Sequence, residues 1–291
     1  MSSLIGCHAL VFTGEFDPQG IESSVSRARA AGFDLIEFPL MEPDTFDSAT
    51  ARRTLEAEGM HASASLGLPL EADISSDDPS VVTAGRRLLD VALNKTAEMG
   101  GSHLCGVLYG SMRKHMSPAS ASGRASSVGA LRTLADQASS LGIALSLEVV
   151  NRYESNLINT SRQALEFLKE VDRPNISVHL DTYHMNIEES DLFQPILNAS
   201  DRLRYMHVGE SHRGYLGTGS VDFGSAFRAL DRINYDGPIV FESFSSAVVS
   251  ATLSNTLGIW RNLWSDGDDL AAHANRFIRD QLSAVRTIEL H

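Results

Sequence analysis

Cysteine, long apolar runs and clustered basic residues are all scarce in this chain of 291 residues. Only two cysteines occur, Cys7 and Cys105, both within apolar runs and without a C-x-x-C pair. This argues against a disulfide framework and a structural zinc site, and it fits a reducing compartment. No apolar stretch approaches the ~18 residues of a membrane span, and the N-terminus lacks the basic and cleavage regions of a signal peptide. We expect a cytoplasmic protein with no membrane partner.

Positive charge is in the minority, since 24 Lys and Arg stand against 37 Asp and Glu, a formal net charge of -13. No basic stripe gathers along the chain, which argues against nucleic acid as a partner. Common catalytic motifs are also missing, among them G-x-x-x-x-G-K-[ST], G-x-S-x-G and H-E-x-x-H. The pair Gly217 and Gly219 is followed by Asp222 where a dinucleotide fingerprint requires glycine. Nucleotide-binding and serine-hydrolase functions therefore lose their support.

Eight short apolar segments bounded by turn residues recur along the chain. They begin roughly 30 to 40 residues apart, which leaves room for a helix between each pair and is typical of parallel βαβ units. The segments are Leu4–Phe12, Asp34–Leu40, His61–Leu68, Ser102–Gly110, Ile143–Val150, Asn175–Asp181, Arg204–Glu210 and Ile239–Phe244.

The connecting segments have helical periodicity. Pro79–Gly100 carries apolar residues at three- and four-residue steps, and Thr160 with Gln163 is in register for a capping box. We expect the serine-rich stretch Ser117–Ser127 to be a loop. A glycine of expected positive φ precedes five of the strands, namely Gly32, Gly59, Gly100, Gly142 and Gly237. The pattern predicts an α/β fold, a single (β/α)8 TIM barrel over residues 1–291, with an open doubly wound sheet as the alternative.

Each of the last four predicted strands ends at a residue that can bind a metal ion. These residues are Glu148, Asp181, His207 and Glu242. Strand alternation turns their apolar neighbours outward to the helices and turns these four inward. Because active sites of such barrels lie at the C-terminal ends of the strands, the four side chains should meet at one mouth.

Three carboxylates that converge in a partly desolvated pocket would repel one another strongly. A divalent cation is the simplest way to neutralise them. Oxygen ligands with one histidine favour Mn²⁺ or Mg²⁺ over zinc, and Co²⁺ also suits this ligand set.

Four segments around these residues resemble the signature segments of the ketose 3-epimerases. This is the D-tagatose 3-epimerase and D-allulose (D-psicose) 3-epimerase group of the xylose-isomerase-like barrel superfamily, and the resemblance runs over the entire chain. The segments are Glu148–Glu154, Leu180–Glu189, His207–Glu210 with Arg213, and Phe241–Phe244.

The resemblance implies a metal-dependent homo-oligomer, a dimer or a tetramer, that acts on free ketoses epimeric at C3. Such pairs are D-fructose and D-allulose, D-tagatose and D-sorbose, or L-ribulose and L-xylulose. The family's metal ligands fall on the same four residues as above. Its residues near the substrate's O1 and O2 fall on Glu154, His184 and Arg213, and an aromatic beside the last ligand falls on Phe244. The pocket around C4 to C6, which differs among members, is expected to draw on His8, Phe12, Ser65, Leu108 and Met112.

Epimerisation needs proton removal on one face of C3 and proton return on the other, with the enediolate held between the two steps. Glu148 and Glu242 are the predicted acid/base pair, and a cation at O2 and O3 would act as the Lewis acid. An aldose–ketose or hydroxypyruvate isomerase on the same barrel is the alternative, and a non-catalytic sugar-binding protein is an alternative of another class. The apolar segment Ala247–Trp264 is expected to pack in the core or at a subunit contact.

Overall fold

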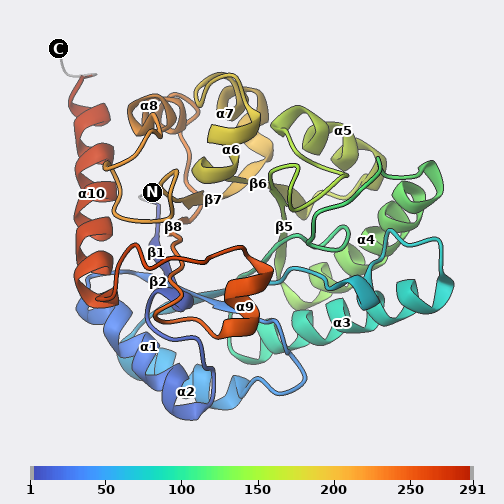
Figure 1. Ribbon diagram of the computed structural model, residues 1–291, viewed down its shortest axis with the longest axis horizontal. Helices are drawn as coiled ribbons and strands as arrows, with labels where there is room; N and C mark the ends of the chain where they lie inside the picture. The colour runs from blue at the N-terminus through green and yellow to red at the C-terminus, as the bar shows by residue number, and fades with distance from the viewer. Residues whose placement is uncertain (1–2, 289–291) are drawn as a thin grey trace.

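Eight parallel strands close into a barrel in which each strand pairs with its neighbours in sequence, and β8 returns to pair with β1 (Figure 1). The structure, a computed structural model, describes residues 3–288. The strands are β1 (Ile5–His8), β2 (Leu35–Pro39), β3 (His61–Ser65), β4 (His103–Gly106), β5 (Ala144–Val149), β6 (Ile176–Asp181), β7 (Leu203–Val208) and β8 (Ile239–Phe241). The predicted TIM barrel is confirmed, and the open doubly wound sheet is wrong.

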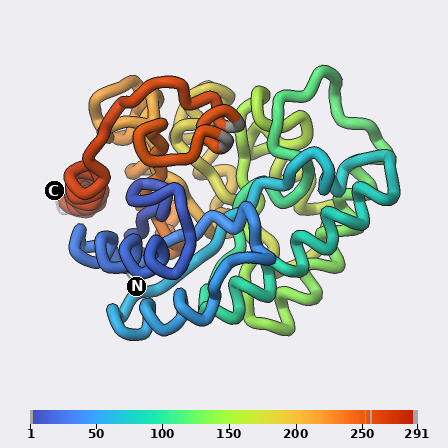
Figure 2. The backbone as a smooth tube through the Cα atoms, turned by 60° about the horizontal axis from the view of Figure 1, so that its bottom comes forward, coloured from blue at the N-terminus to red at the C-terminus, as the bar shows by residue number. Residues whose placement is uncertain are grey.

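Helices connect the strands and surround the barrel. They are α1 (Pro18–Ala30), α2 (Ser48–Glu58), α3 (Pro79–Glu98), α4 (Ala121–Leu141), α5 (Ser161–Val171), α6 (Thr182–Glu188), α7 (Gln194–Ala199), α8 (Phe223–Arg232), α9 (Ala251–Thr256) and α10 (Gly267–Ile288), with the 3-10 helices η1 (Ala9–Val11), η2 (Leu70–Ala72) and η3 (Ser200–Arg202). The red helix α10 lies beside the blue N-terminal elements and packs against β1 and η1 (Figure 2). Within residues 3–288, no helix has the length and apolar character to cross a membrane.

Local sequence signals explain where several of these helices begin. At the start of α5, Oγ1 of Thr160 accepts a hydrogen bond from the backbone amide of Gln163, and Oε1 of Gln163 accepts one from the backbone amide of Thr160. The predicted capping box is therefore confirmed. The expected loop at Ser117–Ser127 is wrong in its second half, because α4 begins at Ala121. Ser120 is its N-cap, and its Oγ accepts a hydrogen bond from the amide of Gly123 at 2.9 Å.

Four of the five glycines expected to have positive φ do have it, with values of 86° at Gly32, 62° at Gly59, 80° at Gly100 and 70° at Gly142. Gly237 is the exception and the expectation there is wrong. A Cβ at Gly237 would lie 2.6 Å from the carbonyl oxygen of Arg204, so close packing rather than backbone conformation accounts for this glycine.

All strands except β6 end earlier than the apolar pattern predicts, and β1 and β4 end four residues early. β1 stops at His8, and the chain then winds into η1. β4 stops at Gly106, whose φ of 110° turns the chain where a Cβ would lie 2.5 Å from the carbonyl oxygen of Leu66. Strand alternation therefore does not extend to residues beyond these points, and this decides which side chains reach the site.

Inward-facing side chains fill the barrel in layers. An apolar cluster of Leu35, Cys105, Tyr205 and Val240 occupies the interior. Two positions further along three of these strands, the same parity brings Glu37, His207 and Glu242 inward. A layer of ionisable groups therefore lies above an apolar layer, toward the C-terminal ends of the strands.

Candidate active site

The four predicted metal-ligating residues converge at the C-terminal end of the barrel. Glu148 lies in β5, Asp181 ends β6, His207 lies in β7 and Glu242 follows β8. All four are buried, and one ligand atom from each lies within 4.8 Å of the others. Because adjacent parallel strands have the same inward parity at these positions, side chains that are far apart in sequence form one cluster.

The donor atoms of this cluster suit a cation. Nδ1 of His207 is buried and has no hydrogen-bond partner among residues 3–288. It lies 3.5 Å from Oε1 of Glu242 and 3.7 Å from Oε1 of Glu148. One unpaired imidazole nitrogen facing carboxylate oxygens is a ligand set for Mn²⁺, Mg²⁺ or Co²⁺. A buried cluster able to hold a metal ion is thus present.

The two glutamates of the cluster have opposite electrostatic environments. Burial raises the pKa of Glu148 to about 8. Burial also opposes the charged form of Glu242, but the positive charges of His207 and Arg213 outweigh it and hold the pKa of Glu242 well below its usual range. Without a metal ion, the pair therefore contains one protonated and one ionised carboxyl group.

Arg213 supplies the positive charge closest to the carboxylates. Its Nη1 lies 2.7 Å from Oε2 of Glu242 and 3.0 Å from Oδ2 of Asp181. The guanidinium is held over the ring of Tyr183, 3.9 Å from its centroid, and 5.1 Å from the centroid of Phe244. These contacts keep the guanidinium at the edge of the cluster, where it faces the pocket.

His184 and Glu154 lie beside the cluster and are positioned by Asn151. The backbone and side-chain N–H groups of Asn151 both donate to Nδ1 of His184, at 3.1 and 2.8 Å, and Asn151 also donates to Oε1 of Glu154 at 2.8 Å. Because Nδ1 accepts, the ring proton is on Nε2, which lies 3.6 Å from Oε1 of Glu148. Burial lowers the pKa of His184 to about 4, so the ring is a neutral donor.

A cavity of about 270 Å³ opens above the cluster. Its lining includes the carboxylates of Glu148 and Glu242 but neither Asp181 nor His207, which lie fully buried beneath. Of the other residues predicted to contact substrate, those that line the cavity are His8, Ser65, Met112, Glu154, His184, Arg213 and Phe244.

Phe12 and Leu108, two residues expected in the pocket, do not line it. Phe12 lies just beyond η1, and its ring packs into the core with the guanidinium of Arg27 5.1 Å from its centroid. Leu108 follows the turn at Gly106 and is buried in the core, whereas its neighbour Val107 faces the cavity. Both were expected there from the family resemblance, and both lie beyond the point where their strand ends.

The segment Ala247–Trp264 has a third role that sequence reasoning missed. Figure 1 shows α9 in front of the barrel strands, and the cavity lining includes the apolar side chains of Leu253, Leu257, Ile259 and Trp260. Trp260 is 78% exposed, so it borders the mouth of the cavity. The segment therefore forms an apolar part of the cavity wall. No local pattern predicts this return of the chain across the barrel.

Glu37, Tyr183 and Asn151 were also missed. Glu37 is the only charged residue of β2, between Ile36 and Phe38, and a lone carboxylate in an apolar strand is the signal that could have found it. Tyr183 lines the cavity and packs against Arg213, and Asn151 holds His184; such pairwise contacts have no signature in one sequence.

A family model described as a xylose isomerase-like TIM barrel matches residues 25–281, in agreement with the closed barrel and with the candidate metal cluster at the C-terminal strand ends. The chain is 62% identical to a ketose 3-epimerase of Arthrobacter globiformis over 99% of both chains. It is 51% identical to an L-ribulose 3-epimerase of Methylomonas sp. (strain DH-1), over 95% of this chain and 96% of the relative. A crystal structure of a D-allulose 3-epimerase from Methylomonas sp. in complex with D-allulose matches with a TM-score of 0.95 at 50% identity, covering 96% of this chain and 97% of that one. The chain belongs to the ketose 3-epimerase family, whose members are isomerases acting on carbohydrates.

Proposed function

We propose that this chain interconverts free ketoses epimeric at C3, with Glu148 and Glu242 as the two acid/base groups. The observation that carries the proposal is the placement of both carboxyl groups in the lining of one cavity, Glu148 from β5 and Glu242 directly after β8, with β6 and β7 between them. The names of the relatives, which include L-ribulose and D-allulose, support a free ketopentose or ketohexose as substrate.

The proton transfer then runs between two faces of C3. The ionised carboxylate removes the C3 proton, and the electron pair of the C–H bond forms the enediolate across C2 and C3. The protonated carboxyl group on the other side delivers its proton to the opposite face, which inverts C3. In the reverse direction Glu148 and Glu242 exchange roles. In the metal-free pocket the two groups have opposite pKa shifts, so that one carboxyl group is protonated and the other is ionised.

Glu148, Asp181, His207 and Glu242 would together hold one divalent ion, with Mn²⁺ as first choice and Mg²⁺ or Co²⁺ as alternatives. When bound, the ion would supply Lewis-acid stabilisation of the negative charge that develops on the substrate oxygens. His184, with its Nε2–H facing the pocket, and Arg213 would donate hydrogen bonds to the substrate near O1 and O2, and Glu154 would accept one there. His8, Ser65 and Phe244 would contact the rest of the sugar.

We further propose that residues 1–291 are one barrel domain, that the protein works in the cytoplasm, and that it forms a dimer or a tetramer. Light scattering of the purified protein measures the subunit number directly, and a monomer would refute that part.

The experiment that tests the function is product analysis. The purified protein, supplied with Mn²⁺, is incubated with single ketopentoses and ketohexoses, and the products are separated by chromatography. The C3 epimer of at least one ketose is expected. An aldose product would instead identify an aldose–ketose isomerase, and binding without any product would identify a sugar-binding protein.

A further inference from the structure

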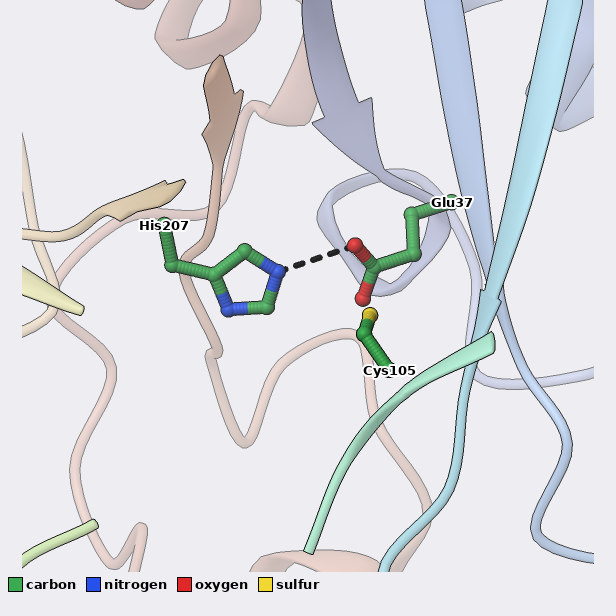
Figure 3. A group of neighbouring side chains, drawn as sticks. All are labelled: Glu37, Cys105 and His207. Carbon is green, nitrogen blue, oxygen red and sulfur yellow. Dashed lines mark hydrogen bonds and ion pairs between the residues drawn. The ribbon is translucent and has the colours of Figure 1, made fainter. Parts of the chain in front are cut away.

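Glu37 is a fully buried carboxylate in the interior of the barrel, in the middle of β2. Its Oε2 accepts a hydrogen bond from Nε2 of His207 at 2.9 Å (Figure 3). The same oxygen accepts another from the hydroxyl of Tyr205 at 2.6 Å. Among residues 3–288 its ion pairs are with histidines only, at 2.9 Å to His207 and 3.5 Å to His8. A buried carboxylate without a lysine or arginine partner is costly to keep, so the contact with His207 needs an explanation.

We propose that Glu37 is a positioning residue for the metal centre. It fixes the ring of His207 so that Nε2 carries the proton and Nδ1 presents its lone pair to the cation. The proposal rests on the function proposed above, because it takes the cluster of Glu148, Asp181, His207 and Glu242 as the metal site.

The hydrogen-bond pattern determines the tautomer. As a metal ligand His207 is the neutral imidazole, with one N–H group and one lone pair, and the hydrogen bond to Glu37 places the N–H group on Nε2. The lone pair is then on Nδ1, the buried nitrogen that faces the carboxylates of Glu148 and Glu242 without a hydrogen bond. A ligating histidine whose second nitrogen donates to a carboxylate is a better electron donor and is held in one ring orientation.

Neighbouring side chains hold Glu37 and the ring in place. The Tyr205 hydroxyl, which binds Oε2 of Glu37, is itself hydrogen-bonded to Oγ of Ser63 at 2.6 Å. The ring of His179 packs against His207 at 86°, with centroids 4.2 Å apart. The carboxylate and the imidazole therefore have little freedom to rotate, as a preorganised ligand requires.

A second metal site at Glu37, His207 and Cys105 is the alternative use of these groups. The three side chains come from β2, β7 and β4 and point toward one another (Figure 3). However, Oε2 of Glu37 and Nε2 of His207 are 2.9 Å apart, which is a hydrogen bond and leaves no space for an ion between them. The geometry thus favours a support for the existing cluster over a second ion.

The experiment compares metal binding by the metal-free wild-type protein, Glu37→Gln and Tyr205→Phe, each titrated calorimetrically with Mn²⁺ and with Mg²⁺. Glu37→Gln keeps the size of the side chain and should weaken Mn²⁺ binding by about 10- to 100-fold. Mg²⁺ binding should weaken less, because Mg²⁺ depends on oxygen ligands more than on imidazole. Tyr205→Phe keeps the partner of His207 and should change Mn²⁺ binding less than Glu37→Gln does.

Each outcome decides something. If the wild-type protein does not bind Mn²⁺ or Mg²⁺, the proposed metal site fails, and this inference fails with it. If the wild type binds and Glu37→Gln binds equally well, the positioning role alone is overturned. If Glu37→Gln and Tyr205→Phe lose the same affinity, and lose it equally for Mn²⁺ and for Mg²⁺, Glu37 has only a structural role. Should Glu37→Gln not fold, Glu37→Asp provides the same comparison, because its side chain keeps the charge but is one methylene shorter and holds the carboxylate farther from Nε2 of His207.

Discussion

Nη1 of Arg213 lies 2.7 Å from Oε2 of Glu242, so a cation that lines the cavity directly contacts a carboxylate of the proposed metal cluster. The same nitrogen lies 3.0 Å from Oδ2 of Asp181. Arg213 thus partly neutralises the cluster and also faces the pocket. Its two roles can be separated, because charge neutralisation affects metal binding whereas hydrogen bonding to a sugar affects substrate binding.

We expect Arg213→Ala to lower kcat/KM by about 10- to 100-fold, the loss of one charge-assisted hydrogen bond to the substrate. Mn²⁺ affinity should stay equal or rise, because a positive charge leaves the neighbourhood of Asp181 and Glu242. Steady-state kinetics and Mn²⁺ titration measure the two effects. Arg213→Lys is the matched control, since it retains charge but loses the planar contact with Tyr183. Weaker Mn²⁺ binding at unchanged KM would contradict the substrate role.

Removal of the metal should lower both activity and stability. A ligand that binds only the native state at a concentration 100 times its Kd adds about 2.7 kcal/mol to the free energy of unfolding. For a chain of this size that corresponds to roughly 4–5 °C in Tm. Thermal melts and activity assays, before and after EDTA treatment and again after Mn²⁺ is restored, measure the effect. Full activity in protein that elemental analysis shows to be metal-free would contradict this prediction.

The metal-free protein should also become less stable as pH rises toward 8. Burial raises the pKa of Glu148 from 4.5 to about 8, so between these values the folded carboxyl keeps a proton that the unfolded one has lost. The free energy of unfolding therefore falls as pH rises through this window. Other groups titrate too, so Glu148→Gln, which cannot lose this proton, is the control.

Urea unfolding in EDTA at pH 6 and pH 8 makes the comparison. Between these values the wild type should lose on the order of 1–2 kcal/mol more than Glu148→Gln does. Parallel losses in the two proteins would show that Glu148 is not the group responsible.

Alternation in short strands explains why the metal cluster could be predicted. Glu148, Asp181 and His207 lie within strands whose neighbouring residues fix their parity, and Glu242 follows β8 by one residue. Phe12 and Leu108 could not be placed in the same way, because η1 and the turn at Gly106 break the alternation before it reaches them. The reliable part of the prediction therefore ends where the strand hydrogen bonds end.

Contacts between distant segments account for what the sequence did not predict. The wall formed by Leu253, Leu257 and Trp260 depends on how the chain returns after β8, which has no periodic signal. Glu37 had the correct parity in β2, but its importance appears only when β7 brings His207 to 2.9 Å. Strand ends indicate candidate ligands, whereas the residues that orient those ligands depend on the closed barrel.

Glu148→Gln and Glu242→Gln should each lose catalysis more than metal binding. Each substitution keeps the size of the side chain and one oxygen, but it removes the group that takes or gives the C3 proton. We expect kcat to fall by about 10²–10⁴-fold in metal-saturated protein. Mn²⁺ titration of each variant establishes saturation before the rates are compared. A near-normal kcat in either variant would refute the two-carboxylate mechanism, and another group would have to deprotonate C3.

The position of the transferred hydrogen separates a 3-epimerase from an aldose–ketose isomerase. In the proposed mechanism the carboxyl group that delivers a proton to C3 is not the one that removed it. In D₂O the delivering group has exchanged with solvent in the free enzyme, so each product molecule should carry deuterium at C3. Proton NMR of the product after less than one-tenth conversion reads this directly, because later cycles would also label the substrate. Substrate kept in D₂O without enzyme is the control for spontaneous exchange.

Deuterium at C1 would identify transfer between C1 and C2. A C3 epimer with no deuterium would mean that the abstracted proton itself returns to C3 without exchange, which two carboxylates on opposite faces of C3 cannot achieve.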